Sequence, residues 1–583
     1  MSGRLRVLGR LRVAPPLVAL ALSALVLGGC GSSSPGTSID PAKAVPASAA
    51  LYAGAVVRPE GSLQKAARTA GRKLTHQADP YLKLLGALQT PGSPALDFKR
   101  DVAPWLGPRA GVFLSAAGSG SEAAVSRLLG LVQRGLLGGG SGSSFPFASR
   151  SLEGALVLDT RDTAKARSFV QTLAKRAGAH SSSYRGTSYQ VANGIAFGLT
   201  KRLVVIGTEP AFHSVIDTTT GGGLSLAASP SYAKLQAAAP SGTLAHLYAN
   251  PGAVSEGANA AHVQGAASAL ALLAGQRLVN VSLVPSESSF ALDVDAVAPE
   301  SGGGAPAGLL AVNPEASQAL GELPGESWLA IGLGDVGKTL GTNAQALQGL
   351  TSLGGLLGGA SSGTPSAGIS LTGIVEGLLK PLTVLGANTA AVKRDFASWM
   401  GSAGVFTSGT GLLELKGGVV IDSKHPALSR AAVAKLGAML RADGSSVERT
   451  SVPGTDAAIA VHVSGLPVVL DIANGQDSSG NTKFVIGIGE QSVEAALHPS
   501  NTLSGAASFG SSGAALGEGI EPNVIVEFPT LLGLLEGVGL SEDPSLSPFV
   551  PYLRSLGTLS GGGKRLTDGV ERFRLVLGLQ GSA

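Results

Sequence analysis

Hydrophobic and polar residues alternate along several stretches of the chain, as they do in half-buried β-strands. The clearest stretch is 277–297, where RLVNVSLVPSESSFALDVDAV alternates on both sides of a polar turn and predicts a β-hairpin. Apolar runs at 154–158 and 203–207 are each followed by a helical pattern, and strands also follow one another directly from 189 to 207. Consecutive hairpins with intervening helices predict an α+β fold built on mainly antiparallel sheet.

Two segments almost 300 residues apart carry nearly the same nine residues. Residues 99–107 read KRDVAPWLG and residues 393–401 read KRDFASWMG, with six identical positions and a matching tryptophan. The signature of this repeat is Asp101, Trp105, Gly107, Asp395, Trp399 and Gly401. We interpret the signature as structural, with each tryptophan anchoring a short turn in the core while the charges face water. The alternative is a binding feature made by the aspartates and their basic neighbours.

Further blocks recur in the same order in both halves of the chain. GALVLDTRDTAKARSFV (from 154) is echoed by GGVVIDSKHPALSRAAV (from 417), RLVVIGTEPAF (from 202) by KFVIGIGEQSV (from 483), and LSLAASPSYAKL (from 224) more weakly by LSGAASFG (from 503). Self-similarity of this length predicts two tandem homologous repeats. We expect repeat 1 at 49–299, a Gly-Pro-rich linker at 300–319 and repeat 2 at 320–581, each an α+β domain.

The first thirty residues have the layout of a secretory signal peptide. Four arginines precede an apolar run from 13 to 27, which is shorter than the roughly 20 residues that a membrane span needs. Leu-Gly-Gly-Cys then ends at Cys30, the only cysteine in the chain. This junction resembles the lipobox of bacterial lipoproteins, which implies that Cys30 receives a diacylglycerol and becomes the mature N-terminus. The alternative is an ordinary secreted protein with an incidental cysteine.

We therefore expect a signal peptide at 1–29, a flexible tether rich in Ser, Pro, Gly and Ala at 30–48, and an extracytoplasmic body held at the cell membrane through Cys30. Removal of the leader also changes the charge balance. The whole chain has 43 basic and 39 acidic residues, but the four arginines of the leader leave 39 against 39 in the mature chain. A neutral balance gives no reason to expect nucleic acid as a partner.

Residues 331–339, IGLGDVGKT, match the phosphate-binding pattern G-x-x-x-x-G-K-[ST] through Gly332, Gly337, Lys338 and Thr339. We interpret the match as chance, because the first repeat has Val56, Pro59 and Glu60 where the second has Gly334, Gly337 and Lys338. Asp422, a candidate Mg²⁺ ligand after the strand VVI, has a counterpart in Asp159 of the repeat that lacks the loop. Both aspartates precede helices, where we expect helix capping rather than nucleotide chemistry.

Other catalytic patterns occur about as often as chance allows. S-x-x-K appears at 62–65 and 231–234 without the K-T-G of penicillin-binding enzymes, and G-x-S-x-G at 359–363 has no strand before it. The eight histidines are scattered, without metal-binding spacing. We therefore expect no catalytic residue, no cofactor and no metal site, with an exported hydrolase as a distant alternative.

Several helical patterns are rich in Leu, Ala and Gly and poor in charge, and they begin at residues 123, 266, 346, 371 and 531. Core helices of an α+β unit have this composition. Helices that line an apolar cavity or lie against a membrane have it too, as in lipid-carrying envelope lipoproteins. Composition leaves both interpretations open.

Four blocks together resemble an uncharacterised bacterial family known as domain of unknown function 3352: VPASAALYAG (from 45), DVAPWLGPRAGVFL (from 101), LVLDTRDTAKARSFV (from 156) and LAASPSYAKL (from 226). The resemblance covers most of 46–580 and implies an architecture without an attached activity. We favour a non-catalytic envelope lipoprotein that binds a protein or scaffolds at the outer face of the cytoplasmic membrane. The alternative is a carrier or sensor of an apolar ligand such as a lipid.

Overall fold

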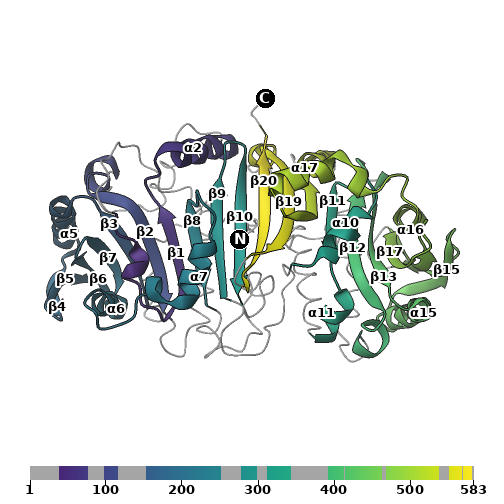
Figure 1. Cartoon of the computed structure of the whole chain (residues 1–583), viewed down its shortest axis with the longest axis horizontal. Coiled ribbons are helices and arrows are strands. Elements are labelled where there is room, and N and C mark those ends of the chain that lie inside the picture. The colour runs from purple at the N-terminus through teal and green to yellow at the C-terminus, as the bar shows by residue number, and fades with distance from the viewer. Residues whose placement is uncertain are drawn as a thin grey trace, which may run out of the picture. The chain divides into compact units, whose positions relative to one another are not determined.

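The structure is a computed structural model that describes residues 38–75, 98–115, 153–250, 278–297, 312–342, 392–411, 414–462, 468–537, 550–566 and 569–580. These residues form two compact units (Figure 1). The N-terminal unit comprises the described residues up to Val312 together with those from Gly563 onward, and the C-terminal unit comprises those from Asn313 to Gly562. Cys30 and the residues expected to form a signal peptide, 1–29, lie outside the described residues.

The N-terminal unit combines a sheet with short helices. Its strands are β1 (Ala49–Val56), β2 (Leu106–Ser115), β3 (Glu153–Thr160), β4 (His180–Tyr184), β5 (Thr187–Ala192), β6 (Ile195–Thr200), β7 (Leu203–Thr208), β8 (Ala245–Ala249), β9 (Leu278–Pro285), β10 (Ser289–Val297) and β20 (Glu571–Leu579). Its helical segments are η2 (Pro41–Lys43), α2 (Gly61–Thr75), the π-helical turn η3 (Phe98–Val102), α5 (Thr163–Ala177), α6 (Glu209–Thr219), η4 (Leu226–Ala228) and α7 (Pro230–Ala238).

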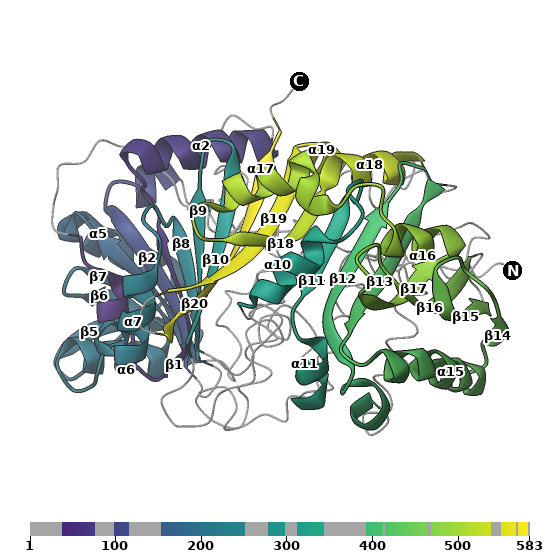
Figure 2. The same ribbon diagram turned by 45° about the vertical axis from the view of Figure 1, so that its right-hand side comes forward.

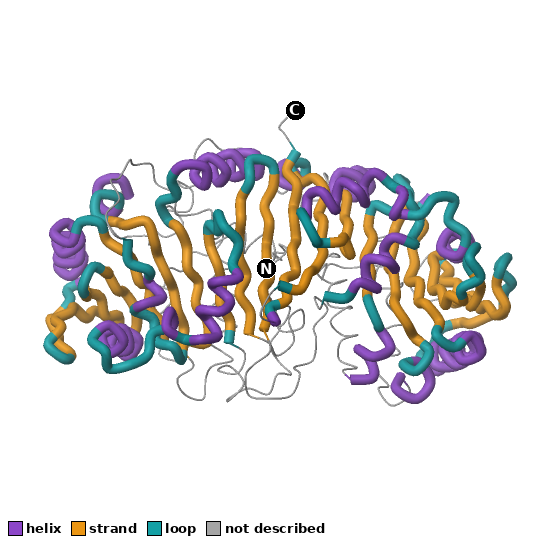
Figure 3. The backbone as a smooth tube through the Cα atoms, in the orientation of Figure 1, coloured by secondary structure: helices purple, strands orange, loops and turns teal. Residues whose placement is uncertain are grey.

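Strand pairing places the N-terminal sheet in the order β20-β10-β9-β8-β1-β2-β3-β7-β6-β5-β4, with antiparallel neighbours throughout. Figure 3 shows the strands in orange and the helices in purple. The hairpin expected at 277–297 is β9–β10. Alternate residues of β7 face opposite sides: Leu203 and Val205 join the core under α6 and α7, whereas Val204 and Ile206 pack with Trp105 and α5. Helices therefore cover both faces of this sheet.

The C-terminal unit is built from the same kinds of elements. Its strands are β11 (Leu329–Leu333), β12 (Met400–Ser408), β13 (Lys416–Ser423), β14 (Ser446–Arg449), β15 (Thr455–His462), β16 (Val469–Gln476), β17 (Thr482–Ile488), β18 (Glu521–Glu527) and β19 (Leu556–Arg565), whose last residues pass into the N-terminal unit. Its helical segments are α10 (Pro314–Gly321), α11 (Val336–Thr342), η6 (Val392–Phe396), α15 (Pro426–Ala442), α16 (Glu490–Leu497), η8 (Leu503–Gly505), α17 (Ala507–Leu516), α18 (Phe528–Gly537) and α19 (Val550–Leu553).

The C-terminal sheet runs in the order β18-β11-β12-β13-β17-β16-β15-β14, again with antiparallel neighbours. Phe484 and Ile486 of β17 pack with Trp399 and α15, whereas Val485 joins α10 and α16 on the opposite face. Figure 2 shows α10 lying along β11 and β12. The prediction of an α+β fold with mainly antiparallel sheet is therefore confirmed.

Eight strands follow the same path in both units. The order β8-β1-β2-β3-β7-β6-β5-β4 of the N-terminal sheet corresponds strand by strand to the order of the C-terminal sheet. An irregularity interrupts β2–β3 pairing and β12–β13 pairing at the corresponding place. Isolated bridges join Pro46 to Ser225 and Pro324 to Thr502, also at matching positions.

The packed body begins earlier than the sequence indicated. We expected a tether to residue 48, but the Asp40 carboxylate accepts a hydrogen bond from the Ala42 amide at 3.0 Å and caps η2. Ala42, Ala44 and Val45 are fully buried, because these small apolar side chains cover the core under α6 and α7. The last part of the expected 300–319 linker likewise forms α10.

The chain also ends in a different unit from the one expected. Strand β20 pairs along its length with β10, so the residues from Gly563 onward belong to the N-terminal unit rather than to a second repeat ending at 581. Two cross-strand ion pairs hold β20 in place: Arg572 Nε lies 2.7 Å from Asp295 Oδ1, and Arg574 Nε lies 2.6 Å from Asp293 Oδ1. Both aspartates are fully buried.

No helix in the described part of the chain is long and apolar enough to cross a membrane. Of the Leu-rich patterns, those beginning at 123, 266, 346 and 371 lie outside the described residues. The pattern beginning at 531 falls largely in α18, where Leu532 and Leu534 are buried. That segment is a packed helix of the C-terminal unit.

Candidate functional site: a buried lysine among three carboxylates

A pocket of about 140 Å³ opens in the C-terminal unit between α10, β13, β17 and the turn that joins β16 to β17. Its polar wall includes Glu322, Asp422, Asp477, Asn481 and Lys483, and its apolar wall includes Ala319, Leu323, Val420, Ala496 and Leu497. One cation and three carboxylates therefore meet in a small space with an apolar wall. This arrangement is the best candidate for a functional site among the described residues.

The fold brings these groups together from distant parts of the sequence. Lys483 on β17 lies directly opposite Asp422 on β13 in the antiparallel register, and side chains at such positions are neighbours on one face of the sheet. Glu322 follows the last residue of α10. Asp477 begins the β16–β17 turn, where its Oδ1 accepts hydrogen bonds from the amides of Ser479 and Asn481, both at 2.9 Å.

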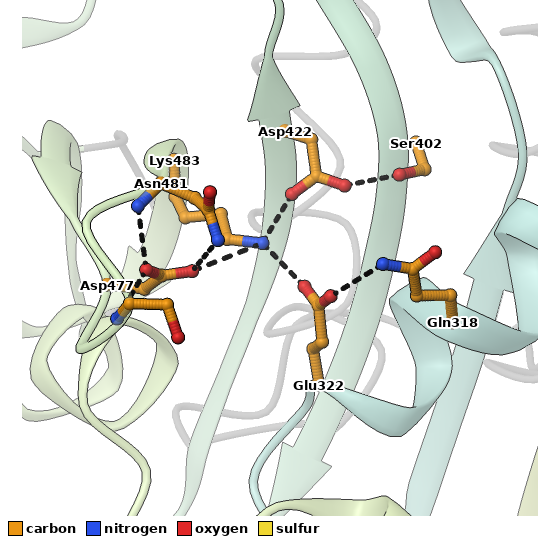
Figure 4. A network of polar contacts seen from close by, with 8 residues as sticks. Gln318, Glu322, Ser402, Asp422, Asp477, Asn481 and Lys483 are labelled. Carbon is orange, nitrogen blue, oxygen red and sulfur yellow. Dashed lines mark hydrogen bonds and ion pairs between the residues drawn. The ribbon is translucent and has the colours of Figure 1, made fainter.

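The lysine ammonium is the centre of the network (Figure 4). Lys483 Nζ donates to Glu322 Oε2 at 2.6 Å and to Asp422 Oδ1 at 2.5 Å, and it lies 3.6 Å from Asp477 Oδ2. An outer set of side chains orients the carboxylates: Ser402 donates to Asp422, Gln318 Nε2 donates to Glu322 Oε1 at 3.3 Å, and Asn481 Nδ2 donates to Asp477 Oδ2 at 3.3 Å. All three acids are therefore held by more than the lysine.

These contacts favour the ionised forms of Lys483 and Asp477. Burial disfavours the charged ammonium, but the hydrogen bonds and charges of Asp422 and Glu322 outweigh it and raise the pKa of Lys483. Burial also opposes the ionised form of Asp477, but hydrogen bonds from Asn481 and Ser479 and the charge of Lys483 outweigh it and lower its pKa. A protonated lysine with its donors engaged is a poor nucleophile and a poor base near neutral pH. The geometry therefore suits charge recognition or local bracing better than proton transfer.

The corresponding place in the N-terminal unit has a different composition. Leu203 of β7 lies opposite Asp159 of β3 there, where the C-terminal unit has Lys483 opposite Asp422. Asp159 is fully buried, and burial raises its pKa. The same strand path thus carries a lysine-centred network in one unit and an apolar side chain in the other.

The signature aspartates and tryptophans occupy equivalent structural positions. Trp105 Nε1 donates to the backbone oxygen of Asp101 at 2.9 Å, and Trp399 Nε1 donates to that of Asp395 at 3.0 Å. Both tryptophans are buried in the cores under α5 and α15. The Asp395 carboxylate pairs with Arg394 and with Lys435 of α15, at 2.6 and 2.7 Å. The signature thus closes a turn over each sheet.

The signature glycines leave room for the aspartate of the neighbouring strand. A Cβ at Gly107 would lie 2.5 Å from Asp159 Oδ2, so a larger residue would collide with a buried carboxylate. At Gly401 the nearest atom would be the backbone oxygen of Asp422, at 3.1 Å. The first glycine is therefore under a tighter steric constraint than the second.

The segment that matches the phosphate-binding pattern forms a strand and a short helix. Gly332 lies in β11, which has antiparallel neighbours on both sides, β12 and β18, unlike the parallel sheet of a phosphate-binding fold. Gly337, Lys338 and Thr339 lie in the seven-residue helix α11. At the N-terminus of that helix the Asp335 carboxylate accepts a hydrogen bond from the Lys338 amide at 3.4 Å. A negative group therefore stands where a phosphate would have to bind.

The expected capping role of Asp159 and Asp422 is wrong. Asp162 caps α5, accepting a hydrogen bond from the Lys165 amide at 3.0 Å, and His425 stands at the N-cap of α15 without a side-chain cap bond. Sequence reasoning also missed Lys483 and its other acidic partners as site residues. Within the described ranges, no group of three or more His, Cys, Asp or Glu side chains is arranged to hold a metal ion.

The fold and the site define an α+β protein built from antiparallel sheets, with a charged pocket in one unit. The chain belongs to the family described as "Protein of unknown function (DUF3352)", whose model matches residues 13–518. A comparison with curated proteins finds no match.

Solved structures offer only distant similarity. The structure of crystal form I of TP0453 is 11% identical over 46% of this chain and 81% of that chain, with a TM-score of 0.25. Crystal form III of TP0453 is 12% identical over 46% of this chain and 83% of that chain, with a TM-score of 0.23. Similarity at this level adds nothing to the fold described above.

Proposed function

We propose that this protein is a non-catalytic lipoprotein of the cell envelope, anchored through Cys30 at the outer face of the cytoplasmic membrane, where it binds or scaffolds other envelope components. The spacing between Cys30 and the folded body supports the anchor. Among the described residues, Ile39 is the first that packs against the core, only nine positions after Cys30, and the residues between are Ser, Gly, Pro and Thr. This is the arrangement expected of a folded domain tied closely to an acylated cysteine.

The chemistry of the pocket supports a binding role over a catalytic one. Lys483 is held protonated by its acidic partners, and the Asp477 carboxylate is held ionised. The pocket of about 140 Å³ is also smaller than the roughly 300–1,000 Å³ typical of sites for drug-sized ligands. We therefore keep the binding or scaffolding function as the proposal and do not extend it to carriage of a lipid in this pocket.

The duplicated organisation belongs to the same proposal. Eight strands follow one path in both units, and the two bridges at Pro46 and Pro324 recur at matching places. Together with the repeated KRD-x-A-x-W-x-G segments, this supports an origin of the two units as tandem homologous repeats. The repeats diverged at one matching position, where the C-terminal unit has Lys483 opposite Asp422 and the N-terminal unit has Leu203 opposite Asp159.

The anchor is tested by metabolic labelling of the full-length chain in a bacterial host with an alkyne analogue of palmitate. We expect label on the wild-type protein, a mature N-terminus at Cys30, and partition into the detergent phase on phase separation. The Cys30→Ser variant is the matched control and should carry no label. An unlabelled wild-type protein, or a mature N-terminus elsewhere, would overturn the anchor.

The binding role needs a separate test, in which the wild-type protein and a Lys483→Met variant are crosslinked in cells and their complexes compared. A defined partner, recovered with the wild-type protein and lost with the variant, supports a function of the pocket. An identical set of complexes from both proteins would remove the pocket from the proposal.

A further inference from the structure

The neutral balance of the mature chain hides a division of charge between the two units. Residues 30–312 and 563–583 contain 27 Lys and Arg against 18 Asp and Glu, a net charge of +9. Residues 313–562 contain 12 against 21, a net charge of −9. An asymmetry of this size between parts of one chain indicates a basic interaction surface. The basic unit is the one that begins nine positions after Cys30.

Two helices of the N-terminal unit carry much of this excess. Neither α2 nor α5 contains an acidic residue, and their basic residues are Lys65, Arg68, Arg72, Lys73, Lys165, Arg167, Lys175 and Arg176. Each helix has a buried apolar side, formed by Ala67, Ala70 and Leu74 in α2 and by Ala166 and Val170 in α5. Each is therefore an amphipathic helix. In α2, Lys65 pairs with Glu287 at 2.8 Å and two further basic residues are half-buried, whereas all four basic residues of α5 are exposed.

The basic residues of α5 form fewer ion pairs than those of the corresponding helix, α15. Arg167, Lys175 and Arg176 are exposed and form no ion pair within the described residues; in α5 only Lys165 has one, with the capping aspartate at 3.3 Å. In α15, Lys435 lies 2.7 Å from Asp395 and Arg430 lies 3.8 Å from Asp456. The positive face of α5 is thus available to an external anion, whereas that of α15 is largely compensated within its own unit.

We infer that the N-terminal unit binds the anionic surface of the membrane through the basic face of α5. Ten residues of extended chain span at most about 35 Å, so an acylated Cys30 would keep this unit close to the headgroups. Anionic lipids attract Lys and Arg near the surface, and the attraction fades within a Debye length of about 8 Å at physiological salt. The inference rests on the proposed position at the membrane, but it is tested without the lipid anchor.

The test is flotation of the chain from residue 31 onward with vesicles, because this chain retains every described residue and lacks Cys30. We expect binding to vesicles of phosphatidylglycerol and phosphatidylcholine at about 0.1 M salt, loss of binding at about 0.5 M salt, and no binding to phosphatidylcholine alone. Each basic residue near the surface contributes up to about fivefold in affinity. The triple variant Arg167→Gln, Lys175→Gln, Arg176→Gln should therefore bind at least tenfold more weakly.

The matched control is Arg430→Gln, Lys435→Gln, Arg441→Gln on α15, which removes the same charge from the other unit and should leave vesicle binding within about twofold. Glutamine has a helix propensity close to that of Lys and Arg, and all six positions are exposed, so both variants should fold. Equal weakening by both variants, or equal binding of wild type to neutral vesicles, would overturn the inference. A chain that floats with anionic vesicles although Cys30 is not acylated in cells would keep this inference and remove the proposed anchor.

Discussion

Replacing Lys483 with methionine removes the only cation among the described residues that line the pocket, while keeping an unbranched side chain of similar length. Glu322, Asp422 and Asp477 would then face one another without the ammonium that now lies 2.5–3.6 Å from each of them. We expect the C-terminal unit to lose stability, because like charges repel and part of the carboxylate surface stays buried. The size of the loss depends on how far water reaches these groups.

Two reference cases bracket the magnitude. Breaking a buried ion pair costs about 3–5 kcal/mol, whereas an exposed pair contributes less than about 1 kcal/mol. The Lys483 side chain is 7% exposed, but Glu322 and Asp422 are 42% and 34% exposed, so water screens the acids. We expect a loss of about 2–3 kcal/mol, between the two cases. For a unit of about 250 residues this lowers Tm by roughly 5–10 °C.

Differential scanning calorimetry of the chain from residue 31 onward measures this loss. The matched control is Lys424→Met, because Lys424 Nζ lies 2.9 Å from Asp335 Oδ1 but its side chain is 51% exposed. The control should cost less than about 1 kcal/mol. A Lys483→Met variant that melts no lower than Lys424→Met would refute the reasoning, because the network would then contribute no more than a surface ion pair.

The pH dependence gives the same experiment a second readout. The pKa of Lys483 is raised in the folded protein, so its contribution is fully present below about pH 10 and is lost as pH rises through the folded pKa. The pKa of Asp477 is lowered in the folded protein, so its contribution is present above about pH 4 and is lost as pH falls through the folded pKa. The difference in stability between wild type and variant should therefore narrow at both extremes and be largest near neutral pH.

Three further predictions concern the N-terminal unit. Burial lowers the pKa of His246 to about 4, whereas the unfolded side chain titrates near 6.5. The stability of the wild-type protein should therefore fall by about 3 kcal/mol as pH drops from 6.5 to 4. Urea titrations should show that the His246→Asn variant loses this pH dependence. Arg572→Met leaves the buried Asp295 without its 2.7 Å partner and should destabilise the N-terminal unit by about 3–5 kcal/mol; hydrogen exchange that instead increased only in residues 313–562 would show that β20 belongs with the C-terminal unit. Gly107→Ala should lower stability by about 1–3 kcal/mol and Gly401→Ala by less, since the new Cβ meets an atom at 2.5 Å in the first case and 3.1 Å in the second; equal melting temperatures in calorimetry would contradict this.

The fold class could be predicted because its signals are local. Alternation at 277–297 produces β9–β10, and the helical patterns that follow the strands ending near Asp159 and Asp422 produce α5 and α15. The pocket could not be predicted in this way. Lys483 meets Asp422 across 61 positions and Glu322 across 161, and only the register of β13 with β17 and the docking of α10 bring them together. The sequence does indicate Asp422 as a candidate residue, but an aspartate between a strand and a helix is equally typical of a helix cap.

The end of the chain shows a signal that pattern reading could have used. Asp293 and Asp295 alternate on one strand, and Arg572 and Arg574 alternate on another, so two complementary charge patterns with a spacing of two indicate cross-strand pairing. The internal repeat instead predicts that the last residues of the chain belong to repeat 2, because duplicated blocks favour a boundary that keeps each copy continuous. A cation beside a buried, ionised aspartate offsets the cost of its burial, and the pairs with Arg572 and Arg574 place β20 next to β10.

Comparison of the two units separates what the fold requires from what each unit adds. Both sheets follow one strand path, although one has Leu203 and the other Lys483 at the place that faces a strand-end aspartate. The path therefore forms without a lysine there, and the ion network is an addition specific to the C-terminal unit. The opposite net charges of the two units are likewise additions to a shared fold, since surface charge on α5 or α15 does not alter the strand order. Charge placement, rather than sheet topology, is consequently where the functions of the two units should be sought.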